Sequence, residues 1–250
     1  MHGSQTIFDG LDGVGKGVFA KAIIEEIKKT SLKFFDIHAY WSKYGRHPTI
    51  NELSAYDVVY LSEPTFHVPS GSMIREELIL KENRNKYSAE EIAQAYALDR
   101  SILYEKVILP ARKKGVHILQ SRSVVSSLMY QPLQARLNNE KKITFNYVKN
   151  LPGNKKALKN PPTLLVIPTI NSIDDIIERL NKRSKKDNAI FENYEFQLKL
   201  KPYFESKKIR KLFEKKGTIV IYPDAGVSID YSREQAKNIW EEYIKNFLKI

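Results

Sequence analysis

The 250-residue chain contains no cysteine, which excludes disulfide bonds and thiolate metal sites. It also lacks long apolar runs, because stretches such as "TLLVIPTI" are too short to cross a membrane. The first ten residues, "MHGSQTIFDG", lack the basic segment followed by an apolar one that marks a signal peptide. We therefore expect a cytoplasmic protein without membrane contact, long enough for one large α/β domain or two small ones.

Acidic residues are scarce relative to basic ones, since 29 Asp and Glu stand against 41 Lys and Arg, a net charge of +12. This excess could attract phosphate-bearing partners. The lysines are spread along the whole chain in doublets such as Lys28–Lys29 and Lys215–Lys216, however, which is typical of solvated surfaces. The net charge is therefore better explained by a generally lysine-rich composition than by a surface that binds nucleic acid.

Strand patterns alternate with helix patterns along the chain. The apolar runs "DVVYLSEPT", "GVHILQS" and "GTIVIYPD" predict strands, and "KFFDIHAYW" is a further strand candidate. "SAEEIAQAYALDRSILYEKVILP" predicts a long helix that is capped near Ser88 and ended by Pro110, whereas "LPGNKKALKNPP" predicts a loop. This alternation predicts a largely parallel sheet covered by helices on both faces, with ligands at the carboxyl ends of its strands.

The stretch "GLDGVGKG" stands between a predicted strand, "QTIFDG", and a predicted helix, "GVFAKAIIEEIKK". In this context a glycine-rich loop with a lysine is typical of a phosphate-binding loop, in which backbone N–H groups and a helix N-terminus surround phosphate oxygens. The residues expected to bind ATP are Gly10, Leu11, Asp12, Gly13, Val14, Gly15, Lys16, Gly17 and Val18. Lys16 would contact the β- and γ-phosphates. Gly17 stands where such loops carry the Ser or Thr that holds Mg²⁺.

Further motifs resemble one family. "QSRSVVSSLMYQ" resembles the thymidylate kinase segment DRYxxSSxAYQ, and "AYALDRS" resembles that family's LFAxDR helix. "LSEPT" is similar to the family's REP turn, and "IIERLNKRSKKDNAIFENYEFQLKLKPYF" is similar to its lid. The resemblance implies a P-loop NTPase-type three-layer α/β sandwich, with a single nucleoside monophosphate kinase domain over residues 1–250. It also implies a helical lid at about 181–195 and an atypical insertion at about 34–56.

The resemblance further implies an enzyme that transfers the γ-phosphate of ATP, bound with Mg²⁺, to dTMP, and it implies a homodimer. The dTMP-binding positions that it implies are Asp12, Glu63, Pro64, Arg75, Tyr96, Arg100, Arg122, Ser126, Ser127 and Tyr130. Tyr96 would stack on thymine, and Arg100, which shares its helix face, would hydrogen-bond the thymine carbonyl. Arg122 would bind the acceptor phosphate, Tyr130 would lie under the sugar, and Asp12 would meet the 3′-hydroxyl. Thymine, uracil and modified pyrimidines fit these contacts alike.

The phosphate loop contains no arginine, so the resemblance implies that the lid supplies the cations for the transferred phosphate. The lid candidates are Arg179, Arg183, Lys185 and Lys186. Arg179 and Arg183 are one helical turn apart and are expected to point the same way, although an exposed basic helix has the same pattern. The catalytic residues implied by the resemblance are Lys16, Arg122, Arg183 and Asp12.

The chain departs from the family at Gly17, at Ser62 (Arg in the REP turn) and at Ser121 (Asp in the DR segment). The changes at Gly17 and Ser121 remove expected contacts to Mg²⁺, so the sequence does not identify the metal ligands. Asp12, Glu63 or a water could replace the missing contacts. A deoxynucleoside kinase is an alternative, in which Glu63 would act as the base for a 5′-hydroxyl. A nucleotide-binding relic without transfer activity, or a regulator that binds nucleotides or nucleic acid, is also open.

Overall fold

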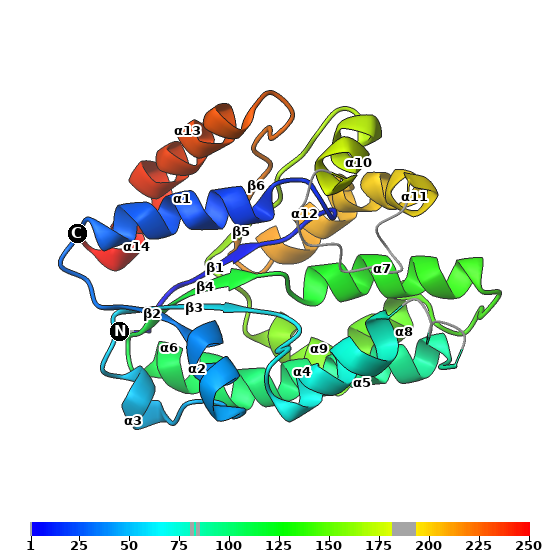
Figure 1. Cartoon of the computed structure of the whole chain (residues 1–250), viewed down its shortest axis with the longest axis horizontal. Coiled ribbons are helices and arrows are strands. Elements are labelled where there is room, and N and C mark those ends of the chain that lie inside the picture. The colour runs from blue at the N-terminus through cyan, green and yellow to red at the C-terminus, as the bar shows by residue number, and fades with distance from the viewer. Residues whose placement is uncertain (1, 81–82, 84–85, 182–193) are drawn as a thin grey trace.

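Six parallel strands form the central sheet, in the order β2-β3-β4-β1-β5-β6. The computed structural model describes residues 2–80, 83, 86–181 and 194–250 (Figure 1). The strands are β1 (Gln5–Phe8), β2 (Phe34–Asp36), β3 (Val58–Ser62), β4 (His117–Ser121), β5 (Leu164–Val166) and β6 (Ile219–Ile221). All the paired strands run parallel, and β1 lies between β4 and β5. The predicted parallel sheet is therefore confirmed, and the carboxyl ends of its strands meet at one edge.

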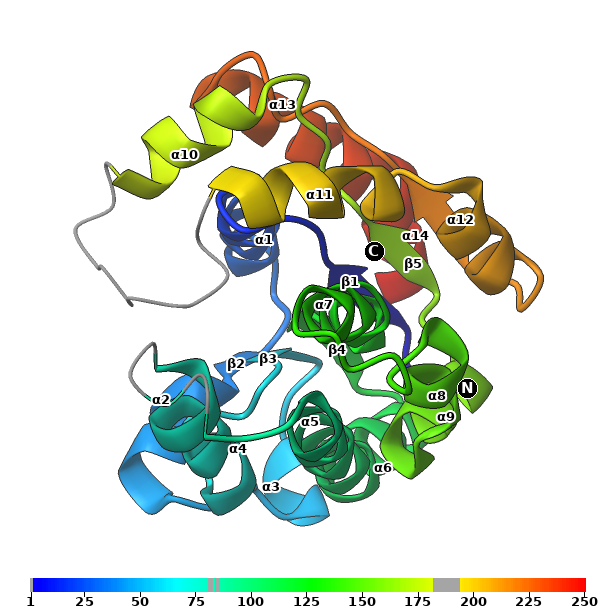
Figure 2. The same ribbon diagram turned by 90° about the vertical axis from the view of Figure 1, so that its right-hand side faces the viewer.

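The first and last helices cover one face of this sheet (Figures 1 and 2). α1 (Lys16–Lys28) packs along α13 (Ile229–Ile239), which continues through a π-helical turn at Trp240–Ile244 into α14 (Lys245–Leu248). Their apolar side chains form a core with strand residues such as Phe8, which is fully buried. This packing fixes the N-terminus of α1 at the end of β1.

Helices from the middle of the chain cover the opposite face (Figure 2). They are α4 (Pro69–Met73), α5 (Ala89–Leu103), α6 (Leu109–Lys113), α7 (Val124–Leu137), α8 (Phe145–Asn150) and α9 (Pro152–Lys159), with π-helical turns at Ile74–Ile79 and Tyr104–Ile108. The segments that follow β5 are α10 (Ile173–Asn181), α11 (Tyr194–Phe204) and α12 (Lys207–Glu214). With helices on both faces, the predicted three-layer sandwich is confirmed. In the described ranges, no helix combines the length and apolar character that a membrane span requires.

The N-terminal boundary of α5 agrees with the prediction, whereas its C-terminal boundary does not. Ser88 caps α5 in a reciprocal capping box with Glu91. The helical path was predicted to end at Pro110, but it continues to Lys113. A π-helical turn immediately before α6 changes the hydrogen-bond spacing, so the missing N–H of the proline does not break the helix.

Two other segments also differ from the prediction. "KFFDIHAYW" is extended only in β2, because Asp36 accepts a hydrogen bond from the backbone N–H of His38 and so begins α2 (Ile37–Tyr44). "LPGNKKALKNPP", predicted as a loop, contains α9, which has a proline at its first position. Gly153 allows α9 to approach α5, because a Cβ there would lie 1.8 Å from the carbonyl oxygen of Ala97.

The segment predicted as an insertion, residues 34–56, forms β2, α2 and α3 (Ile50–Leu53). β2 pairs with β3 and forms one edge of the sheet. Ile37, Trp41 and Leu53 are fully buried in the core on the α5 side. This segment is therefore an integral part of the sandwich.

Candidate functional site

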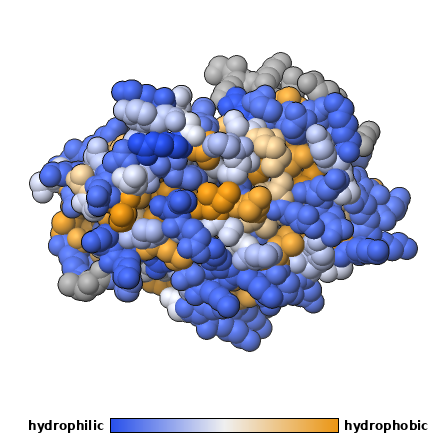
Figure 3. Space-filling model, turned by 90° about the horizontal axis from the view of Figure 1, so that it is seen from below, coloured by the Kyte–Doolittle hydropathy of each residue, from blue (hydrophilic) through white to orange (hydrophobic). Residues whose placement is uncertain are grey.

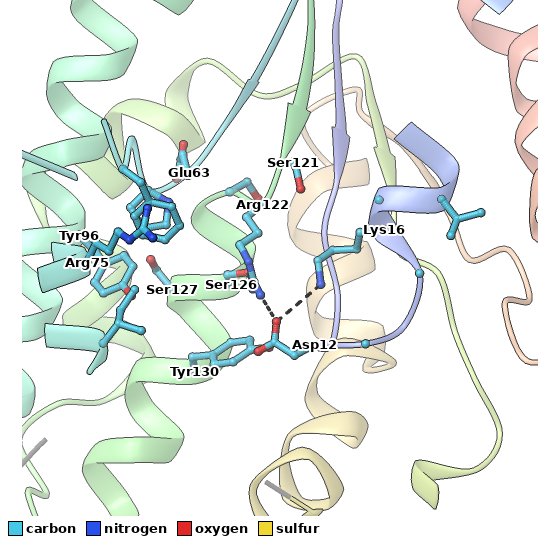
Figure 4. Close-up of a pocket in the computed structure, with 18 of the residues that line it drawn as sticks. Asp12, Lys16, Glu63, Arg75, Tyr96, Ser121, Arg122, Ser126, Ser127 and Tyr130 are labelled. Atoms are coloured by element: carbon cyan, nitrogen blue, oxygen red, sulfur yellow. Dashed lines mark hydrogen bonds and ion pairs between the residues drawn. The ribbon is translucent and has the colours of Figure 1, made fainter. Parts of the chain in front are cut away.

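A cavity of about 1100 Å³ lies at the carboxyl ends of β1, β3 and β4 (Figure 4). Its walls come from the loop between β1 and α1, the turn after β3, α5, the start of α7, Arg179 of α10 and the residues around Ser228. This is the edge at which the parallel sheet was predicted to bind ligands.

The loop of residues 10–18 adopts backbone conformations that favour glycine. Gly13 and Gly15 have positive φ angles of 81° and 105°. A Cβ at Gly13 would also lie 3.0 Å from Ile176 and Leu180 of α10. α1 begins at Lys16, so its N-terminus faces the cavity, as a phosphate-binding loop requires.

Six of the nine predicted ATP-binding residues line the cavity: Asp12, Gly13, Gly15, Lys16, Gly17 and Val18. The other three, Gly10, Leu11 and Val14, are buried and do not line it. Lys16 Nζ donates hydrogen bonds to the carbonyl oxygens of Gly10, at 3.1 Å, and Leu11, at 2.5 Å. These bonds hold the ammonium group inside the loop.

Asp12 lies at the centre of a charged cluster (Figure 4). Its carboxylate forms an ion pair with Arg122, accepts a hydrogen bond from Tyr130 Oη at 3.0 Å and lies 4.0 Å from Lys16 Nζ. Burial raises the pKa of Tyr130, so its hydroxyl keeps its proton and acts as a donor. The cluster therefore links the phosphate loop to α7 through one buried carboxylate.

Arg122 follows β4 with a φ of 62°, a left-handed conformation that is uncommon for residues other than glycine. Its backbone N–H donates to the carbonyl oxygen of Phe8, the last residue of β1. Its guanidinium Nη1 lies 3.4 Å from Ser126 Oγ. Such strained residues are common at functional sites, and this one directs its cation into the cavity.

Arg100 is 2% exposed and is held on several sides. Its Nε donates to Glu63 at 2.8 Å, its Nη2 donates to Ser127 Oγ at 2.9 Å, and its Nη1 donates to Asn154 Oδ1. Gln120 Nε2 donates to the second oxygen of Glu63 at 2.9 Å. These bonds fix the guanidinium plane against the cavity, as a rigid recognition group requires.

Glu63 is buried, and that burial raises the pKa of its carboxyl group to about 7. The neighbouring Arg100 guanidinium opposes this effect without cancelling it. Glu63 lines the cavity, so a carboxyl group that titrates near neutral pH lies beside the expected substrate.

The other predicted substrate residues lie around the same cavity. Pro64, Arg75, Tyr96, Ser126 and Ser127 all line it. Ser126 also donates a hydrogen bond to the buried Asp9 at 2.6 Å, which fixes the start of α7 to the end of β1.

Of the four predicted lid cations, one lies among the described residues. Arg179 lines the cavity and donates from Nη1 to the carbonyl oxygen of Ala225, at 2.8 Å. Arg183, Lys185 and Lys186 lie outside the described residues.

Sequence patterns had not predicted several residues of the site. Asn154 reaches Arg100 from α9, a segment that had been predicted as a loop. Gln131 and Gln134 line the cavity from α7. Their helical spacing from Ser127, four and seven residues later, would have placed them on the same face of α7.

Within the described ranges, no cluster of three or more His, Asp or Glu residues could hold a metal ion. The carboxylates nearest the phosphate loop are already engaged. Asp9 accepts hydrogen bonds from Gly10, Ser123 and Ser126, and Asp12 is paired with Arg122. This donor set fits a metal ion that is held mainly by a bound nucleotide and water, and not by a protein cage.

Comparison with known proteins gives consistent matches. A family model described as thymidylate kinase matches residues 50–223. A thymidylate kinase from Caldanaerobacter subterraneus is 29% identical over 201 residues, which cover 80% of this chain and 79% of that protein. A probable thymidylate kinase from Pyrococcus abyssi is 34% identical over 136 residues, 52% of this chain and 53% of that protein.

A solved structure of thymidylate kinase from Candida albicans has the same fold, with a TM-score of 0.64 and 20% sequence identity. It covers 98% of this chain, and this chain covers 94% of it. The fold likeness extends through the phosphate loop, which precedes the region that the family model matches.

Proposed function

Because the chain belongs to the thymidylate kinase family, we propose that it transfers the γ-phosphate of ATP to dTMP, giving dTDP. The observation that carries this proposal is a single cavity that joins the phosphate loop to the residues expected to bind dTMP. Phosphoryl transfer needs both substrates in line and their charges neutralised, and one shared cavity supports the first requirement because it lets the two substrates meet.

In this proposal Lys16 contacts the β- and γ-phosphates of ATP, and Arg122 binds the phosphate of dTMP. The position of Lys16 at the start of α1 supports the first assignment. The position of Arg122 beside Ser126 supports the second. A dTMP phosphate is already anionic, so it attacks without a general base. Asp12 meets the 3′-hydroxyl, and Tyr130, which is bonded to Asp12, lies under the sugar. That Arg183, Lys185 and Lys186 supply the lid's cations for the transferred phosphate remains a prediction.

We propose that Mg²⁺ arrives with ATP and keeps most of its water ligands. Gly17 and Ser121 both line the cavity without offering a carboxylate, so the protein would contact the ion through water. When bound, the ion neutralises charge on the phosphates.

A deoxynucleoside kinase is the second candidate, favoured by Glu63. A carboxyl group with a pKa near 7 at the cavity wall suits a general base for a 5′-hydroxyl. Its bonds to Arg100 and Gln120 oppose this role, because they hold it away from a reacting hydroxyl.

One coupled assay with ATP and Mg²⁺ separates these candidates. We expect turnover of dTMP and none of thymidine. Turnover of thymidine in place of dTMP would establish the deoxynucleoside kinase. Binding of ATP and dTMP without any dTDP would leave a nucleotide-binding relic, and binding to DNA that falls steeply with salt would support the regulator.

The homodimer and the cytoplasmic location stay predictions. Figure 3 shows hydrophobic side chains gathered near the middle of the face formed by the helices that lie lowest in Figure 1. Leu98 of α5 is 58% exposed and Met73 of α4 is 40% exposed, and these two helices pack together. We propose that this side of the molecule forms the dimer interface.

A further inference from the structure

Most of the net positive charge lies on one surface of the folded protein. Residues 139–160 and 205–217 contain 12 lysines and arginines against 3 glutamates, which gives a net charge of +9, and the whole chain has +12. The first segment includes α8 and α9, and the second includes α12. The surface formed by these two segments is called the α12 face below. Along the sequence the lysines are dispersed, but folding brings these two segments together.

Two contacts hold α12 alongside α8 and α9. Lys208 Nζ, near the start of α12, lies 3.6 Å from the centre of the Phe145 ring at the start of α8. Beyond the end of α12, Thr218 Oγ1 donates to the carbonyl oxygen of Pro162, just after α9, at 2.8 Å. Figure 2 shows α12 on the same side of the molecule as α8 and α9. The cations of the two segments therefore share one surface, and none of them lines the substrate cavity.

The cations of α12 are exposed because Ile209 and Phe213 direct the apolar side of this helix into the core. Arg210 Nε lies 3.8 Å from Glu214. Within the described ranges, the other cations of this segment form no ion pair, namely Lys207, Lys208, Lys211, Lys215 and Lys216. Neighbouring like charges repel one another, so an approaching polyanion would be bound favourably.

Aromatic rings lie among these cations. The guanidinium carbon of Arg210 lies 4.8 Å from the centre of the Tyr222 ring. That of Arg136, at the end of α7, lies 5.9 Å from the ring of Tyr203, which is 38% exposed and immediately precedes α12. Lysines bind phosphates and aromatic rings stack on unpaired bases, and this combination is typical of surfaces that bind single-stranded nucleic acid. Anionic membranes and acidic proteins would use the cations but not the rings.

We propose that the α12 face binds single-stranded nucleic acid, with phosphates at its lysines and unpaired bases stacked on its aromatic rings. This binding goes beyond the proposed function and does not depend on it. It also differs from that of a regulator, which would bind nucleic acid without turnover. The α12 face and the substrate cavity share no residue, so binding and catalysis can coexist.

Fluorescence anisotropy across a salt titration measures the binding of the full chain to a mixed-sequence single strand of about 20 nucleotides. Lys207→Gln with Lys211→Gln removes two cations of α12. Each phosphate contact contributes about 0.7 to the slope of log affinity against log salt, so the slope should become shallower by about 1.4. At about 0.1 M salt the affinity should fall about 25-fold. Lys43→Gln with Lys237→Gln removes the same charge at exposed positions elsewhere and should change neither quantity. Both variants should keep the natural unfolding temperature and turnover.

Tyr203→Leu keeps an apolar side chain but removes the flat ring, so it should weaken binding about tenfold and leave the salt slope unchanged. Tyr44→Leu, at a 50% exposed position of α2, is its control and should have no effect. The inference is overturned if the natural chain does not bind the single strand, or if both lysine variants weaken binding equally, since overall charge would then explain it. It is also overturned if Tyr203→Leu binds like the natural chain, or if the duplex of the same sequence, phosphatidylserine vesicles or polyglutamate bind as tightly as the single strand.

Discussion

At the scale of single residues, the missing hydroxyl at Gly17 is compatible with two states of the protein. The protein is either an active kinase that holds Mg²⁺ differently or a kinase fold that has lost its activity. A Cβ added at Gly17 would meet nothing within 4 Å, so a serine fits there. We expect the natural chain to be active. Gly17→Ser and Ser121→Asp should each lower the Mg²⁺ concentration at half-maximal rate roughly fivefold, since each added contact contributes about 1 kcal/mol. Initial rates across a Mg²⁺ titration measure this change.

Gly17→Ala is the control for this pair, because it adds the Cβ without the hydroxyl and should leave the Mg²⁺ requirement unchanged. A natural chain that is inactive at every Mg²⁺ concentration, and gains turnover only in the double variant, would contradict the prediction. The missing hydroxyl would then mark a lost activity.

Glu63 predicts how stability depends on pH. Its pKa in the folded protein, about 7, exceeds its ordinary value of 4.5, so the folded state binds more protons than the unfolded state between these values. The stabilisation is present below about pH 4.5 and is lost as the pH rises through 7. Relative to Glu63→Gln, the natural chain should lose several degrees of its unfolding midpoint between pH 5 and pH 8.

Thermal unfolding at a series of pH values measures this difference. Glu76→Gln, at an exposed position, should follow the natural chain throughout. Parallel curves for the natural chain and Glu63→Gln would show that the carboxyl stays ionised beside Arg100 over the whole range.

At the scale of elements, the contact between α9 and α5 predicts a strong effect of a single methyl group. In Gly153→Ala the new Cβ would lie 1.8 Å from the carbonyl oxygen of Ala97, so α9 must move away. We expect a loss of about 1–3 kcal/mol or more in denaturant unfolding. Affinity for dTMP should fall as well, because Asn154 of α9 holds Arg100. Gly17→Ala, at an open position, should cost no stability, and an equal loss in both variants would contradict this account.

The same contact shows what the sequence could predict and what it could not. The phosphate loop and the cap at Ser88 depend on neighbouring residues, so local patterns predict them. Arg100 was predicted as a recognition residue, but its bond to Asn154, which follows 54 positions later, depends on how two helices pack. The burial of Gln134 depends on that packing too. Tertiary contacts of this kind leave no local pattern to detect.

At the scale of the whole molecule, the exposed side of α4 and α5 predicts a dimer. We expect the natural chain to sediment as a dimer and Leu98→Lys to sediment as a monomer, because a buried lysine would lack a partner in the interface. Sedimentation velocity measures both. Ile250→Lys, at the 46% exposed C-terminal residue, is the control and should stay dimeric. A monomeric natural chain, or a dimeric Leu98→Lys, would contradict the proposed interface.

The central place of β1 has a consequence for how the protein is made. β1 leaves the ribosome well before its two neighbours in the sheet, since Gln5 pairs with Ile118 and Thr6 pairs with Leu164. At a synthesis rate of about 5–20 residues per second, on the order of ten seconds pass before both strands that pair with β1 have been made. During that time a strand with two open edges is a target for chaperones and for aggregation. The strand that ends at the phosphate loop is therefore synthesised long before the two strands that enclose it.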